Sequence, residues 1–105
     1  ILFMKKCGDF SIGSSVWPGL SKVIEECGEV VQVGGKLIAT GGNDQHYDGS
    51  DLRCRLMDEL ADVSAAIQYM LAHNTYDWRA FEDRIQTKLQ LFNLWHDENV
   101  TNVES

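Results

Sequence analysis

The chain has 105 residues, of which 44% are hydrophobic, 24% charged and 10% aromatic, a composition typical of one small globular domain. Sixteen acidic residues against nine basic ones give a net charge of −7, and the scattered Lys and Arg exclude a nucleic-acid polymer as the partner. No apolar run approaches the ~20 residues that cross a bilayer, so we expect no membrane partner. An odd count of three cysteines favours free thiols in a reducing cytoplasm.

Apolar residues recur at intervals of three and four after Pro18, which predicts an all-α fold of three long helices. Residues 1–16 form a loop-rich leader in this interpretation, because glycines and serines interrupt their apolar residues. The first helix is expected to begin near Pro18 and to run to about Thr40, where the Gly41-Gly42 pair stops it.

This first helix has apolar residues on more than one side. The side that we expect to form the core carries Leu20, Val23, Ile24, Cys27, Val30, Val31 and Ile38. The opposite side is charged, yet Val33 and Leu37 sit beside its acids. A second packing partner is therefore expected on that side as well.

A second helix is expected to follow the turn-rich stretch 41–50 and to run to about His73, with Ser50 or Asp51 as its N-cap. Its apolar stripe consists of Leu52, Leu56, Leu60, Val63, Ile67 and Met70. A third helix is predicted from Trp78 to about Trp95. We divide the chain into the leader, a helical domain over 17–96, and a polar, frayed tail over 97–105.

Both of the first two helices carry acids three residues apart. The first has an E-x-x-E at Glu26 and Glu29, and the second has an E-x-x-D at Glu59 and Asp62. Such pairs repel one another on adjoining helical turns unless a cation neutralises them. Several carboxylates without His or Cys ligands indicate Mg²⁺, with Mn²⁺ as a possible substitute.

Glu59 falls at about 20° from Leu52 and Met70 on a helical wheel, inside the apolar stripe. A carboxylate held there must be protonated, hydrogen-bonded, paired or bound to metal. Spacing alone leaves a second interpretation open, in which the acids are solvated and paired at i, i+4, Lys22 with Glu26 and Arg55 with Glu59.

The order of these motifs resembles the MazG-like all-α nucleoside triphosphate pyrophosphohydrolases. The resemblance covers nearly all of 17–95: W-P-G-L-x-K-x-x-E-E-x-G-E from Trp17, E-L-A-D from Glu59, and K-x-x-x-x-x-x-W from Lys88. It implies Mg²⁺ ligands at Glu26, Glu29, Glu59 and Asp62, with Glu25 and Asp58 as outer groups. It also implies cleavage of a (deoxy)nucleoside triphosphate into monophosphate and pyrophosphate, in nucleotide-pool house-cleaning.

Other residues are candidates for the same reaction. Glu25 or Glu29 is our candidate for the base that activates water. Lys36 and Lys88 are candidates for phosphate contacts, although a solvated or acid-paired lysine is the simpler explanation of each. Trp17 and Trp95 would contact a base, although tryptophans at helix ends more often belong to a core.

Three helices cannot enclose a nucleotide, so we expect a homodimer, or a dimer of dimers, to complete a bundle. Other metal sites fail: Arg55 stands where a calcium loop needs Glu, no Glu-x-x-His supports di-iron, and His46, His73 and His96 are too dispersed for zinc. No P-loop glycine motif is present. Two alternatives stay open: a phosphoribosyl-ATP pyrophosphohydrolase-like enzyme, and a non-catalytic helical dimerisation module.

Overall fold

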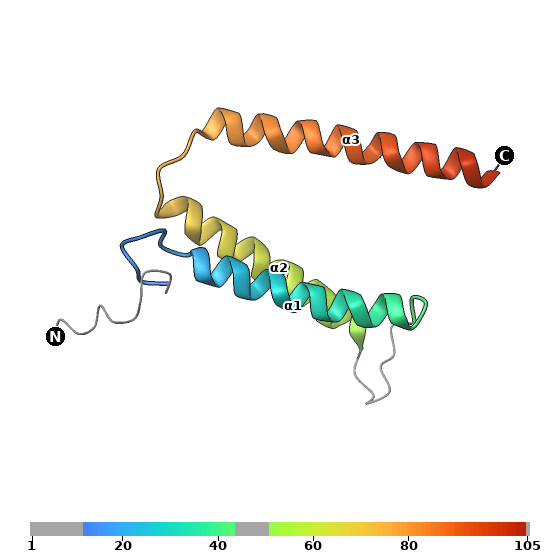
Figure 1. The fold of residues 1–105 in the computed structure, drawn as a ribbon, viewed down its shortest axis with the longest axis horizontal. Helices are drawn as coiled ribbons and strands as arrows, with labels where there is room; N and C mark the ends of the chain where they lie inside the picture. Colours follow the sequence, from blue (N-terminus) through green and yellow to red (C-terminus); the bar gives the residue numbers. More distant parts are fainter. Residues whose placement is uncertain (1–11, 44–50, 105) are drawn as a thin grey trace. The chain divides into compact units, whose positions relative to one another are not determined.

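The computed structural model describes residues 12–43 and 51–104 (Figure 1). The predicted leader up to residue 11, the loop residues 44–50 with His46 and the candidate cap Ser50, and residue 105 lie outside the described residues. The described residues form the helices α1 (Leu20–Ala39), α2 (Leu52–Ala72) and α3 (Trp78–Glu104), which confirms the all-α prediction. Across these same ranges, no helix combines the length and the hydropathy that spanning a bilayer requires.

The chain divides into two compact units, residues 1–74 with α1 and α2 and residues 75–105 with α3. In the first unit α1 and α2 pack side by side and run in opposite directions (Figure 1). The predicted stop of α1 is confirmed, because Gly41 and Gly42 adopt φ of 66° and 93°, and Gly42 donates a backbone hydrogen bond of 2.8 Å to the carbonyl of Leu37.

Acidic caps begin the other two helices. The Asp51 carboxylate accepts hydrogen bonds from the N–H groups of Arg53, at 2.9 Å, and Cys54, at 3.2 Å, which confirms one of the two predicted caps for α2. Asp77 accepts from the N–H of Ala80 at 3.0 Å at the start of α3. This helix continues to Glu104, so the expected end near Trp95 is wrong, and no Gly or Pro follows Trp95 that would stop a helix.

The side of α1 that faces α2 differs from the predicted core side. Val33 is only 2% exposed, and it lies on the charged side of the wheel. On the predicted core side, Ile24, Val31 and Ile38 are 63%, 71% and 83% exposed, whereas Leu20, Val23 and Val30 are half-buried. The packing face of α1 is therefore shifted toward the charged side, where a second packing partner is expected, and Glu59 of α2 lies near Glu26 there. We call Ile24, Val31 and Ile38 the outer stripe.

The turn before α1 is attached to the end of α2. Asn74 donates its Nδ2 hydrogens to the carbonyls of Pro18, at 2.9 Å, and Met70, at 2.7 Å. Gly19 has φ of 89°, and a Cβ atom there would come within 2.9 Å of Cδ1 of Tyr69. These contacts begin α1 at Leu20 and fix its register against α2.

Candidate functional site

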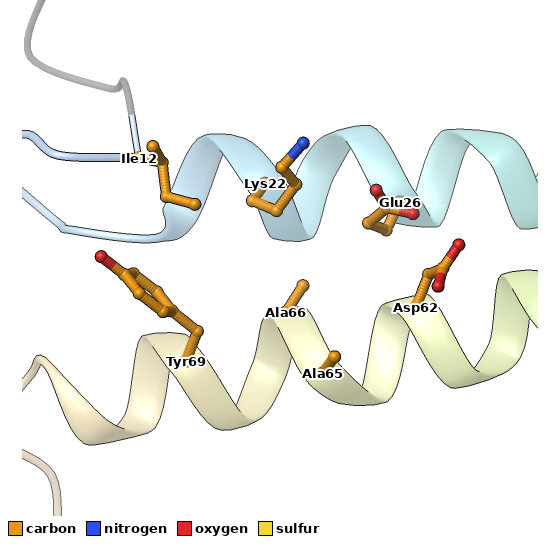
Figure 2. Close-up of a pocket in the computed structure, with 7 residues that line it drawn as sticks. All are labelled: Ile12, Lys22, Glu26, Asp62, Ala65, Ala66 and Tyr69. Atoms are coloured by element: carbon orange, nitrogen blue, oxygen red, sulfur yellow. The ribbon is translucent and has the colours of Figure 1, made fainter.

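The interface of α1 and α2 brings together the acids of the two motifs. Oxygen atoms of Glu26, Glu59 and Asp62 all lie within 4.8 Å of one another, and so do those of Glu25, Glu26 and Glu29. Figure 2 shows Glu26 and Asp62 pointing toward each other across the groove between the helices. We call Glu26, Glu29, Glu59 and Asp62 the carboxylate cluster.

Two carboxylate oxygens of this cluster are buried without a hydrogen-bond partner. They are Oε2 of Glu26 and Oε2 of Glu59. Desolvated carboxylate oxygens are unfavourable unless a proton or a cation compensates them. These atoms are therefore the strongest structural indication that something positively charged belongs in the cluster.

The cluster raises the pKa of two of its members. Burial raises the pKa of Glu26 above its usual 4.5, and repulsion from Glu29 and Asp62 adds to this, while Lys22 acts in the opposite direction. The pKa of Glu59 is raised first by a hydrogen bond to Glu29, then by burial and by repulsion from the surrounding acids. Without a cation, the cluster therefore retains protons that exposed carboxylates would release.

The structure does not show the two i, i+4 ion pairs expected if the acids were solvated, Lys22 with Glu26 and Arg55 with Glu59, among the residues that it describes. Lys22 pairs with Glu25 at 3.2 Å and not with Glu26, because the Glu26 side chain turns into the groove. No ion pair joins Arg55 to Glu59 in the ranges that the structure describes. The negative charges of Glu26 and Glu59 are therefore not neutralised by these i, i+4 pairs.

A pocket of about 390 Å³ adjoins the cluster. Its lining comes from the turn before α1 and from the facing sides of both helices, with Ile12, Lys22, Glu26, Asp62, Ala65, Ala66 and Tyr69 (Figure 2). Glu26 and Asp62 thus belong both to the cluster and to the pocket wall. A ligand held in this pocket would touch any cation in the cluster.

The remaining predicted site residues lie at varied positions. Trp17, 56% exposed, has a φ of 57°, an uncommon backbone conformation for a bulky residue. Lys36 is half-buried on α1, two turns beyond Glu29. Lys88 and Trp95 belong to the second unit, where Lys88 Nζ lies 5.6 Å from the centre of the Phe92 ring.

The sequence patterns do not identify Lys22 or Tyr69 as pocket residues. They give Lys22 only as part of the W-P-G-L-x-K motif and as the partner of an acid, and they give Tyr69 no role. Helical spacing could have found both, because Lys22 lies one turn before Glu26 and Tyr69 lies two turns after Asp62. Ile12 had no comparable signal, since it precedes the helix.

The donor atoms of the cluster are all carboxylate oxygens, which suits a hard divalent cation such as Mg²⁺ and not a zinc or iron centre. His73 is committed elsewhere, since its Nδ1 bonds the carbonyl of Tyr69 at 2.8 Å. The chain matches no known family model, no curated protein and no solved structure.

Proposed function

We propose that the protein is a Mg²⁺-dependent nucleoside triphosphate pyrophosphohydrolase. The observation that carries the proposal is the pair of buried, unpartnered carboxylate oxygens of Glu26 and Glu59. Glu29 and Asp62 complete the donor set that would hold the metal. A ligand pocket that opens onto these acids supports a reaction on phosphates, because an acidic protein binds polyanions only with the help of cations.

In the proposed reaction, the oxygen of water bonds to the α phosphorus and the bond from that phosphorus to the α–β bridging oxygen breaks. The nucleoside monophosphate and pyrophosphate are released, and a carboxylate takes the proton of the water. Glu25 and Glu29 are the candidates for that base, since both adjoin Glu26. Bound Mg²⁺ supplies charge neutralisation and a more acidic water.

We further propose that the working form is a homodimer, or a dimer of dimers. The outer stripe of α1 supports this, because Ile24, Val31 and Ile38 expose most of their surface and α2 packs elsewhere. Burying such side chains stabilises an assembly by about 1.5–3 kcal/mol each. A second copy of the chain is the partner that we assign to this stripe.

The same stripe favours the second candidate function, a non-catalytic dimerisation or protein-interaction module. A phosphoribosyl-ATP pyrophosphohydrolase-like activity would use the same acids on a different substrate. If the protein were only an interaction module, the carboxylate cluster would not be needed for its function. The two classes therefore differ in whether neutral replacements of the acids have any consequence.

The test is to measure pyrophosphate release from a panel of canonical and modified nucleoside triphosphates and phosphoribosyl-ATP, with Mg²⁺, with Mn²⁺ and with EDTA. We expect metal-dependent release from at least one substrate. Release only from phosphoribosyl-ATP would select the related enzyme. No release from any substrate, together with unchanged melting on addition of Mg²⁺, would favour the interaction module.

A further inference from the structure

The pocket beside the cluster is acidic at one end and apolar and aromatic at the other. Glu26 and Asp62 form one end, and Ile12 and Tyr69 form the other (Figure 2). Lys22 lies between these ends on the α1 side. With a cation bound between Glu26 and Asp62, the pocket would suit a ligand with anionic groups at that end and an apolar, ring-sized group at the other.

We infer that this pocket receives the nucleoside half of the triphosphate, with Tyr69 against the base and Lys22 on the phosphate next to the sugar. The inference rests on the proposed function, because the carboxylate cluster determines where the phosphates lie. A volume of about 390 Å³ falls within the range of about 300–1,000 Å³ that small-molecule sites occupy.

Tyr69 is held in place before any ligand binds. Its ring stacks on the His73 ring with centroids 4.1 Å apart, and it packs so closely on Gly19 that no Cβ fits there. A ring that is already ordered loses little conformational entropy when a ligand packs on it. Tyr69 is therefore a preorganised wall for the base.

Lys22 is free to exchange its partner. Its ammonium group is 3.2 Å from Glu25, in a pair that is open to solvent and therefore weak. A phosphate bound at the cluster would offer more negative charge than one carboxylate. Lys22 would then contact the phosphate, and Glu25 would be released toward the reacting water.

The pocket floor provides a test that leaves every acid in place. Ala65 is exposed on the floor, and Ala66 beside it is buried. Ala65→Leu fills the space assigned to the nucleoside. Ala72→Leu is the matched control, because Ala72 is exposed on the same helix and does not line the pocket.

Calorimetry with Mg²⁺ compares two probes: an α,β-methylene nucleoside triphosphate, which cannot be cleaved, and inorganic tripolyphosphate, which has no nucleoside. Ala65→Leu should weaken binding of the nucleotide analogue by about tenfold or more and leave tripolyphosphate binding unchanged. Ala72→Leu should alter neither. If circular dichroism shows that Ala65→Leu is unfolded, Tyr69→Ala is tested with the same two probes instead. It should also weaken binding of the nucleotide analogue and leave tripolyphosphate binding unchanged.

The outcomes separate this inference from the proposed function. Unchanged binding of the analogue to Ala65→Leu, or equal loss of both probes, would overturn the assignment of the pocket. So would wild-type protein that binds the analogue no more tightly than tripolyphosphate. If wild-type protein binds neither probe in the presence of Mg²⁺, the proposed function fails, and this inference fails with it.

Discussion

A side-chain hydrogen bond with Glu29 of α1 is the largest cause of the raised pKa of Glu59 on α2. Two carboxyl groups share a hydrogen bond only while one of them keeps a proton. Oε2 of Glu59 is buried without a hydrogen-bond partner. The raised pKa therefore favours a proton on Glu59, at the position where the proposed enzyme would hold Mg²⁺.

Glu59→Gln should separate stability from catalysis. The amide keeps the shape and the hydrogen-bond donor of protonated Glu59 without the charge, so we expect the metal-free mutant to melt at the same temperature as wild type or higher. Pyrophosphate release should fall by about 10²-fold or more, since a ligand of the proposed Mg²⁺ loses its charge. Thermal melting in EDTA and a pyrophosphate assay measure the two effects.

Glu98→Gln is the matched control, because Glu98 is an exposed residue of α3. This substitution should change neither property. Near-wild-type turnover of Glu59→Gln would remove Glu59 from the mechanism, and with it much of the case for the site.

The raised pKa of Glu59 also predicts how stability depends on pH without metal. Between the usual value of 4.5 and the raised value, the folded state binds more protons than the unfolded chain. The free energy of unfolding contributed by Glu59 therefore falls as pH rises through this window. Glu59→Gln removes this loss, so its stability relative to wild type should increase as the pH rises above 4.5. Urea denaturation in EDTA measures the difference, and a constant difference across the range would contradict the prediction.

Addition of Mg²⁺ should raise the thermal stability of the wild-type protein. A cation bound only by the folded state stabilises it by about 2.7 kcal/mol when its concentration is 100 times Kd. We expect a higher melting temperature for wild type with Mg²⁺ or Mn²⁺ than with EDTA, and a smaller increase for Asp62→Asn. An equal response to K⁺ at matched ionic strength would indicate screening of charge and not a metal site.

Local signals in the sequence were sufficient to predict most helix ends. Asp51 and Gly41-Gly42 act through hydrogen bonds and dihedral angles within a few residues, so their effects do not depend on the rest of the fold. The placement of Glu59 against α1 also followed from its position inside an apolar stripe.

The packing side of α1 was not predictable in the same way. Val33 and Val31 lie on different sides of this helix, and both are good core residues. The choice between them depends on which side chains α2 presents, which is a property of the pair of helices. Ile12 entered the pocket for a similar reason, because the turn before α1 is placed by contacts with the end of α2.

Gly19→Ala should disrupt that turn. Its φ of 89° is unfavourable for alanine, and the added Cβ would lie 2.9 Å from Tyr69 Cδ1 and 3.1 Å from Met70 Cα. We expect a loss of about 2 kcal/mol or more in the free energy of unfolding. Gly35→Ala is the matched control, since nothing lies within 4 Å of its added Cβ and a helix-interior alanine gains about 0.5–1 kcal/mol. Denaturant titration gives both values, and equal effects of the two substitutions would contradict the packing around Gly19.

Val31→Lys tests whether the outer stripe joins two copies of the chain. Val31 is 71% exposed, so a lysine there leaves the packing of α1 on α2 intact. In a dimer built on this stripe, the substitution would bury two unpaired ammonium groups near the axis, and the Kd of the dimer should rise about 10²-fold or more. Gln32→Lys adds the same charge at the next exposed position of the helix, outside the stripe, and should leave the assembly unchanged.

Sedimentation velocity at micromolar concentration should give a dimer or tetramer for wild type and Gln32→Lys and a folded monomer for Val31→Lys. A stably folded wild-type monomer would exclude the homodimer as the working form, and it would require the proposed active site to be complete within one chain.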